Sequence, residues 1–209
     1  MTIDNKTFIN GTPADYREQS TFSYKLNYMR RYIPIVLILV FSLLIDVHVG
    51  HAIDLTLLRD TPVKIYFSPR GGCTDAIINA IEQAKTEILV QAYSFTSAPI
   101  AKALVNAYKK GINVQVILDK SQRSEKYTSA TFLTNAGIPT YIDDRHAIAH
   151  NKIMVIDKET VITGSFNFTK AAEEKNAENL LIITSKELAK VYIENWKNHF
   201  EHSEKYLRE

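Results

Sequence analysis

The amino-acid sequence predicts an α/β fold: a mixed, mostly parallel β-sheet flanked by helices on both faces. Two observations carry this prediction. From residue 62 onward, short runs rich in Val, Ile and Leu alternate with longer segments whose apolar residues recur at helical spacing. Glycine or proline stands at several boundaries between these segments, where such residues begin or end regular structure. Neither an internal repeat nor a low-complexity tract interrupts the alternation.

The first half of this region predicts alternating strands and helices. The expected strands, short and rich in apolar and β-branched residues, are Val63–Ser68, Glu87–Ala92 and Val114–Leu118. The expected helices are Thr74–Lys85, Pro99–Lys110 and Ser124–Ala136. Proline suits the first turn of the second helix, because the N–H that it lacks would have no partner there. Gly111 and Gly137 end the second and third helices.

The second half predicts mainly strands. These are Pro139–Ile142, Lys152–Asp157, Thr160–Thr163 and Leu180–Thr184. The middle two form a hairpin, for which Lys158–Glu159 is the expected turn. An amphipathic helix, Lys186–Phe200, closes the region and carries the single tryptophan, Trp196. Residues 53–209 are therefore expected to form one domain with its own core.

Residues 1–52 predict a separate segment. The run Ile33–Ile45 is almost wholly apolar and follows Arg30–Arg31. A run of this length is too short to span a bilayer comfortably and suits the core of a secretory signal peptide. Small residues, Gly50 and Ala52, stand at positions −3 and −1 of a possible cleavage site after Ala52.

Polar residues ahead of Met29 leave alternatives open. Either translation starts at Met29 and the signal is removed, or residues 33–45 form an uncleaved membrane anchor behind a cytoplasmic tail. A buried core helix is the third option, which the flanking charges disfavour. We expect an exported protein, periplasmic or secreted, with membrane anchoring as the alternative.

Charge and cysteine content narrow the function only slightly. The formal net charge of +2 is weaker than nucleic-acid binders usually show, so any basic surface must be local. A single cysteine, Cys73, excludes an intrachain disulfide framework.

The chemistry is concentrated in residues 150–167, which read H-x-K-x4-D and then G-S-x-N. Its polar side chains suit a phosphodiester: His150 is a nitrogen nucleophile and Lys152 is a fixed cation. Ser165 and Asn167 are neutral donors for phosphate oxygens. Apolar residues lie between them, so a hydrophobic scaffold holds a few convergent polar groups, as a preorganised site requires.

Strand periodicity indicates how these side chains are directed. His150 and Lys152 are two residues apart, so they share a face and can reach one bound phosphate together. Asp157 lies at an odd offset from both and points the other way, which suits it to bracing the turn rather than touching substrate. Gly164 allows the backbone to approach a ligand closely, and nearby amides can cradle an anion.

The motif resembles the HKD signature of the phospholipase D superfamily. Residues 62–200 as a whole are similar to its small, single-motif bacterial endonucleases of the Nuc type. Three further segments match that subgroup: Tyr93-Ser94-Phe95-Thr96-Ser97, Ile117-Leu118-Asp119 and Asn176-Ala177-Glu178-Asn179. The resemblance implies the phospholipase D/nuclease fold with one motif per chain.

The resemblance also implies a covalent mechanism. In this superfamily the histidine attacks phosphorus, and water then hydrolyses the phosphohistidine, which divides one displacement into two easier steps. His150 corresponds to that nucleophile, and Lys152, Ser165 and Asn167 to the phosphate-binding groups. Glu178 corresponds to the acceptor that orients the ring; without the resemblance, it is more simply a solvated loop carboxylate. Asp157 belongs to the signature, but its expected role is structural.

The mechanism needs a second histidine to protonate the leaving oxygen, and the sequence has a single H-x-K motif of this kind. Small members of the superfamily pair two chains about a two-fold axis, which implies a homodimer whose two His150 residues meet at one phosphate. No metal or other cofactor is expected, because Cys73 is alone and no C-x2-C pair occurs. The acidic pair Asp143–Asp144 is expected in a turn ahead of the motif.

Three classes of function fit the motif. The first is a metal-independent, non-specific endonuclease acting on DNA or RNA. The second is a phospholipase D-type hydrolase of membrane phospholipids, against which stands the lack of a basic amphipathic helix after residue 52. The third, a binding protein without turnover, is disfavoured because every polar residue of the motif is present.

Overall fold

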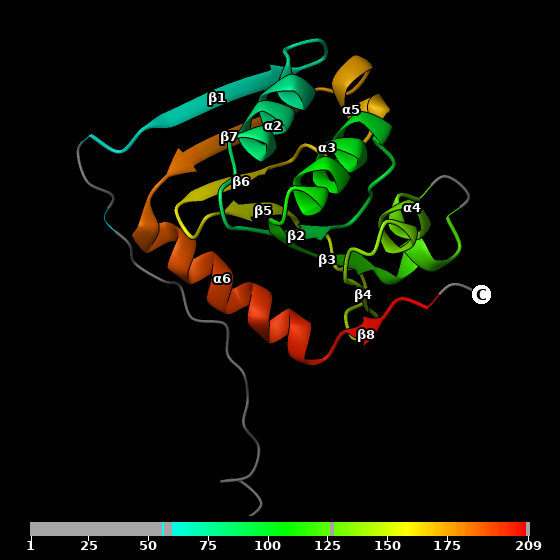
Figure 1. The fold of residues 1–209 in the computed structure, drawn as a ribbon. Coiled ribbons are helices and arrows are strands. Elements are labelled where there is room, and N and C mark those ends of the chain that lie inside the picture. The colour runs from blue at the N-terminus through cyan, green and yellow to red at the C-terminus, as the bar shows by residue number, and fades with distance from the viewer. Residues whose placement is uncertain (1–55, 57–59, 126–127, 208–209) are drawn as a thin grey trace, which may run out of the picture. The chain divides into compact units, whose positions relative to one another are not determined.

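The structure is a computed structural model that describes residues 56, 60–125 and 128–207 (Figure 1). They belong to one unit of the chain, Asp54–Glu209. The expected signal peptide or anchor, with its apolar run at 33–45, lies outside the described residues. Within the described ranges, no helix is both long and apolar enough to cross a membrane.

Eight strands form one sheet in the order β1-β7-β6-β5-β2-β3-β4-β8. The strands are β1 Val63–Ser68, β2 Glu87–Ala92, β3 Asn113–Asp119, β4 Thr140–Asp143, β5 Lys152–Ile156, β6 Thr160–Gly164, β7 Glu178–Thr184 and β8 Glu204–Lys205. The helices are α2 Cys73–Glu82, α3 Ala98–Lys109, the 3₁₀ turn η1 Lys120–Arg123, α4 Ala130–Asn135, α5 Lys170–Glu174 and α6 Lys186–Glu201.

The α/β class is confirmed, but the expectation of a mostly parallel sheet is wrong. Among the described strands, only β2–β3 and β3–β4 pair in parallel. These are the strands between which a helix crosses over, as parallel neighbours require. The five remaining pairings are antiparallel. A tight turn joins β5 to β6, and such a connection can only give antiparallel neighbours.

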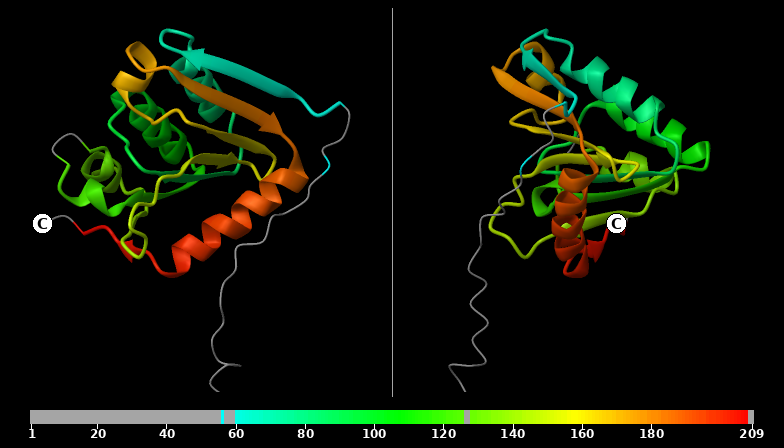
Figure 2. Two further views of the ribbon diagram at one scale, coloured as in Figure 1. Left: turned by 180° about the vertical axis from the view of Figure 1, so that it is seen from behind. Right: turned by 90° about the vertical axis from the view of Figure 1, so that its left-hand side faces the viewer.

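Helices cover both faces of the sheet, as predicted (Figures 1 and 2). On one face, α2, α3, α4 and α5 bury a large core against alternate residues of the strands, including Val90, Met154 and Ile162. On the other face, α6 packs Trp196 against Leu89, Ile117 and the outward side of the hairpin. The Trp196 indole N–H also donates to the carbonyl of Val90 at 3.0 Å, which fixes α6 across β2.

Several local expectations need correction. The helix predicted at 124–136 is reduced to α4, preceded by η1, and neither α5 nor β8 was predicted. The hairpin turn is centred on Asp157–Lys158 rather than Lys158–Glu159. Both central residues have positive φ, 54° and 58°, and the Glu159 N–H donates to the Ile156 carbonyl at 3.0 Å. Positive φ at both central positions is typical of a type I′ turn, and the pairing of Ile156 with Thr160 leaves three residues, 157–159, between the strands.

Candidate active site

Except for Asp157, the predicted site residues gather at one end of the sheet, where β5 and β7 begin and where β1, β2 and β6 end. Lys152 pairs with Ala92 across β5 and β2, and Gly164 pairs with Leu180 across β6 and β7. Glu178 pairs with Ser68 across β7 and β1. The antiparallel arrangement of β5, β6 and β7 therefore brings Lys152, Gly164 and Glu178 to the same end of the sheet.

His150 and Lys152 lie beside each other at this end of the sheet. The Lys152 ammonium Nζ is 2.9 Å from His150 Nδ1, and it donates to the carbonyl oxygen of His150 at 2.7 Å. The imidazole is exposed, whereas Lys152 is only 7% exposed. Tyr93 packs beside both groups, with its ring centroid 4.5 Å from that of His150 and 5.1 Å from Nζ. A phosphate that approaches the exposed ring therefore meets a cation already held next to it.

Burial changes the proton affinity of Lys152. Removal from water disfavours the charged ammonium and lowers the pKa of Lys152 to about 8, while the negative charge of Glu178 acts in the opposite direction. A cation in such surroundings interacts more strongly with a phosphate than a solvated one does, because little water screens it.

Glu178 is half-buried at the first position of β7. Its carboxylate accepts a hydrogen bond from the Asn176 side-chain amide at 3.1 Å. Among the described residues, no hydrogen bond joins Glu178 to His150, whose Nδ1 contacts Lys152 instead. Glu178 thus lies where its charge acts on Lys152, and its expected role in orienting His150 stays a prediction.

Gly164 and Ser165 form a tight connection with Asn179. The Ser165 amide donates to the Asn179 carbonyl at 3.1 Å and to its side-chain Oδ1 at 3.0 Å, and the Ser165 hydroxyl accepts from the Asn179 amide at 3.0 Å. A Cβ on Gly164 would lie 2.3 Å from the Asn179 carbonyl oxygen, and Gly164 has φ of 146°. Glycine is therefore required here by the close approach of β7.

Asn167 differs from Ser165 in having a free acceptor. Its Oδ1 is buried and has no hydrogen-bond partner among the described residues. Buried polar atoms normally find a partner in the protein or in bound molecules. Phosphate oxygens are acceptors, so Asn167 would bind one through its side-chain NH2 group and not through Oδ1. The Ser165 hydroxyl already accepts from the backbone and keeps its proton to donate.

Asp157 lies at the other end of β5 from His150 and braces a neighbouring segment. Its carboxylate accepts from the backbone amides of Lys85, Thr86 and Glu87, at 2.7 to 3.2 Å, and from the Thr86 hydroxyl at 2.8 Å. Burial on its own would raise the pKa of Asp157, but these hydrogen bonds outweigh it and hold the pKa below its usual value. The braced segment is the entry to β2, not the hairpin turn itself.

A second polar cluster was not foreseen from the sequence. Asp143, expected in a turn, is the last residue of β4 and is completely buried. Its carboxylate is surrounded by His146, His199 and His202, and the four side chains are close enough to hold a metal ion. The sequence contains two spacings that could have indicated this cluster, D-x2-H at 143–146 and H-x2-H at 199–202. No local sequence pattern, however, indicates that these two segments, more than 50 residues apart, meet in the fold.

Comparison with known proteins agrees with the fold and with the resemblance to the phospholipase D superfamily. The family described as "Cardiolipin synthase, PLD-like domain" matches residues 77–200, more than half of the chain. This chain belongs to the phospholipase D superfamily. Members of the superfamily are phosphodiester hydrolases, and so is this chain.

Individual members of the superfamily are similar over most of the domain. A protein named phospholipase D from Rickettsia conorii is 44% identical over 145 residues, which are 69% of this chain and 72% of the relative. The crystal structure of the phospholipase D family member Nuc from Salmonella typhimurium matches with a TM-score of 0.68 and 38% identity, covering 71% of this chain and all of that one. NucT from Helicobacter pylori matches with a TM-score of 0.66 at 23% identity, which supports the fold alone.

Proposed function

We propose that this chain is a metal-independent, non-specific endonuclease that cleaves DNA or RNA through a covalent phosphohistidine at His150, in a site shared by two chains. The observation that carries this proposal is the pairing of an exposed imidazole with a nearly buried ammonium, 2.9 Å apart, at the end of the sheet. One phosphate group can contact both, so a nucleophile and a charge-stabilising cation act on the same phosphorus atom.

The reaction proceeds in two displacements. A ring nitrogen of His150 forms a bond to phosphorus as the bond from phosphorus to the leaving oxygen breaks. Water then attacks the phosphohistidine and releases His150. Lys152 and the side-chain amide of Asn167 bind the non-bridging oxygens, and the Ser165 hydroxyl donates its proton to one of them. A positioned acid–base group contributes roughly 10²–10⁴-fold, so much of the acceleration must come from this fixed arrangement of donors.

The leaving oxygen needs a proton, and its donor is the His150 of a second chain. The three other histidines in the described part of the chain all converge on Asp143, so they do not serve this role. A two-fold axis brings equivalent surfaces together, which allows two copies of one motif to complete a single site.

Mixed dimers test the shared site. Wild-type chains and His150→Ala chains are mixed in equal amounts and allowed to exchange. If the site is shared, only dimers with two wild-type chains are active, and these are about a quarter of all dimers. The rate per chain, counting both kinds of chain, should then be about a quarter of that of the wild type. Independent sites would leave about half, and that outcome would contradict the shared site.

Phospholipid hydrolysis is the second candidate, because the Rickettsia conorii relative is named phospholipase D. The structural similarity to Nuc, over the whole of that chain at 38% identity, supports the nuclease. The deciding assay incubates the purified protein with plasmid, single-stranded DNA, RNA and phospholipid vesicles, all in EDTA, with His150→Ala as control. Cleavage of lipid alone would favour the second candidate. Nucleic-acid cleavage should also weaken steeply with salt.

Export is part of the proposal. It is supported by the apolar run at 33–45 and the small residues before position 53. The N-terminal sequence of the protein purified from its natural membrane and soluble fractions tests it. A new N-terminus near residue 53 supports cleavage, while an intact chain in the membrane fraction supports the anchored alternative.

A further inference from the structure

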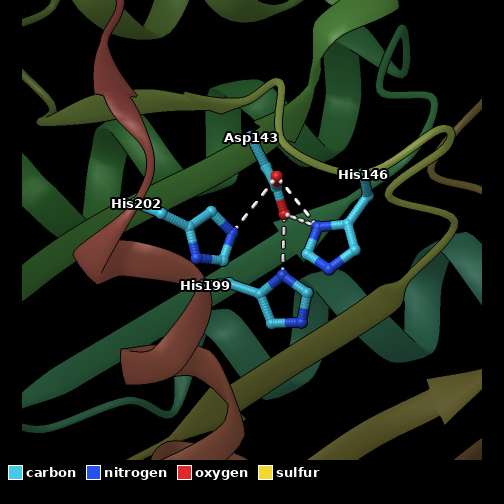
Figure 3. Close-up of side chains that lie close together, drawn as sticks. All are labelled: Asp143, His146, His199 and His202. Carbon is cyan, nitrogen blue, oxygen red and sulfur yellow. Dashed lines mark hydrogen bonds and ion pairs between the residues drawn. The ribbon is translucent and has the colours of Figure 1, made fainter. Parts of the chain in front are cut away.

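Asp143, His146, His199 and His202, called here the Asp143 cluster, bring together two distant segments of the chain (Figure 3). Asp143 is the last residue of β4, and His146 lies in the loop that follows it. His199 lies in the last turn of α6, and His202 follows directly after that helix. The cluster thus connects the end of α6 to the loop that leads to His150.

The cluster has the dimensions of a zinc site. Nδ1 of His199 is 2.7 Å from the Asp143 carboxylate, Nδ1 of His146 is 3.0 Å from it, and Nε2 of His202 is 3.3 Å from it. The ligand atoms all lie within 4.8 Å of one another. Tetrahedral zinc with bonds of about 2.0–2.2 Å separates its ligands by roughly 3.3–3.5 Å. Binding an ion would lengthen the two short contacts of the carboxylate with His199 and His146 and bring the imidazoles closer to one another.

Hydrogen bonds within the cluster do not satisfy all of its polar atoms. The Asp143 carboxylate has no solvent exposure, and its ion-pair partners among the described residues are the three histidines, with no lysine or arginine. Nε2 of His202 is buried and lacks a hydrogen bond in the described part of the chain, despite its short distance from the carboxylate. A buried carboxylate and an unpartnered buried nitrogen that face the same point are both satisfied by a cation between them.

We propose that Asp143, His146, His199 and His202 bind one Zn²⁺ ion as a structural site. Imidazole and carboxylate ligands suit zinc, and four protein ligands leave no open position for substrate, as in structural rather than catalytic sites. The backbone amide of Arg145 already donates to Oδ1 of Asp143 at 3.2 Å, which fixes the carboxylate. The ion would hold α6 against the loop that presents His150, without taking part in the displacement at phosphorus.

Zinc stoichiometry tests the site directly. The full-length chain is stripped with chelator and dialysed against Zn²⁺, and the bound metal is measured by mass spectrometry and calorimetry. We expect one Zn²⁺ per chain. His146→Ala is the informative variant, because its side chain is 45% exposed and its loss should leave the fold intact. Affinity should fall by more than the roughly 10–100-fold typical of changes outside the ligand shell.

A matched control separates this site from adventitious binding. The chain has six histidines, and the variant His48→Ala/His51→Ala/His150→Ala keeps only the three of the cluster. It should still bind one Zn²⁺ with wild-type affinity. The visible absorption of bound Co²⁺ should show tetrahedral coordination in this control and lose that signature in His146→Ala.

Thermal unfolding gives a readout independent of activity. Zn²⁺ should raise the Tm of the wild type and of the triple variant, because a ligand that binds only the folded state stabilises it, and should leave the Tm of His146→Ala nearly unchanged. A folded wild type that binds no Zn²⁺ would overturn the proposal. Equal zinc affinity in wild type and His146→Ala, or loss of binding in the triple variant, would overturn it as well.

Discussion

Asp157 is part of the motif that carries the chemistry, yet its contacts indicate a purely structural role. Asp157→Ala removes a carboxylate that accepts hydrogen bonds from three consecutive backbone amides and one hydroxyl at the entry to β2. His150 lies at the opposite end of β5. We therefore expect this variant to lose stability while the folded molecules keep the catalytic rate of the wild type.

The size of the loss follows from those contacts. A hydrogen bond to a charged group is worth about 1.5–3 kcal/mol when buried. Most of the donors to Asp157 are exposed, so water replaces part of the loss. We expect a fall in the free energy of unfolding of about 2–4 kcal/mol in total. For a domain of this size, that lowers the Tm by roughly 5–15 °C.

The pH dependence of this loss has a definite sign. The pKa of Asp157 is lower in the folded state than its usual value. The stabilisation is therefore fully present above the ordinary aspartate pKa of about 3.9 and is lost as the pH falls through the lower, folded-state pKa. The difference in unfolding free energy between wild type and Asp157→Ala should be constant near pH 7 and should shrink in acid.

Urea unfolding followed by circular dichroism measures the stability, and turnover at a temperature where both proteins are folded measures the chemistry. Glu194→Ala, which removes an exposed carboxylate from α6, is the matched control and should change neither quantity. If Asp157→Ala unfolds like the wild type but has lost turnover as completely as His150→Ala, Asp157 acts in the reaction and the reasoning is refuted.

Two further predictions concern Lys152 and Gly164. Because the pKa of Lys152 is about 8, kcat/KM should fall as the pH rises through that value, as the ammonium loses its proton. The free energy of unfolding should instead rise between that pH and the usual lysine pKa. In Lys152→Arg, the fall of any remaining kcat/KM should move to higher pH, and a fall at an unchanged pH would contradict its assignment to Lys152. Gly164→Ala should lower the free energy of unfolding, measured in urea, by more than about 2 kcal/mol, because the added Cβ collides with the Asn179 carbonyl. Gly72→Ala is the control: Gly72 also has positive φ, but a Cβ there would contact no other atom, so the loss should be smaller. Equal losses in the two variants would contradict the role of the close approach of β7.

Much of the site could be predicted from the sequence because its determinants are local. The two-residue spacing predicts that His150 and Lys152 share a face; His150 lies just before β5, and the heads of the two side chains are in contact. The strands β1 and β2 begin and end at the residues predicted from their short apolar runs. Side-chain alternation and turn chemistry depend on a few consecutive residues, so they can be inferred before the fold is known.

The tertiary structure decided the features that depend on distant segments. The sheet is mostly antiparallel because β5 pairs with β2, β7 lies between β1 and β6, and β8 pairs with β4, and the sequence does not specify which strands become neighbours. Asp157 finds its partners about 70 residues earlier in the chain, and Asp143 meets two histidines that follow it by more than 50 residues. Periodicity shows which face a side chain occupies, but only the packing of α6 and the strands determines which polar groups share that face.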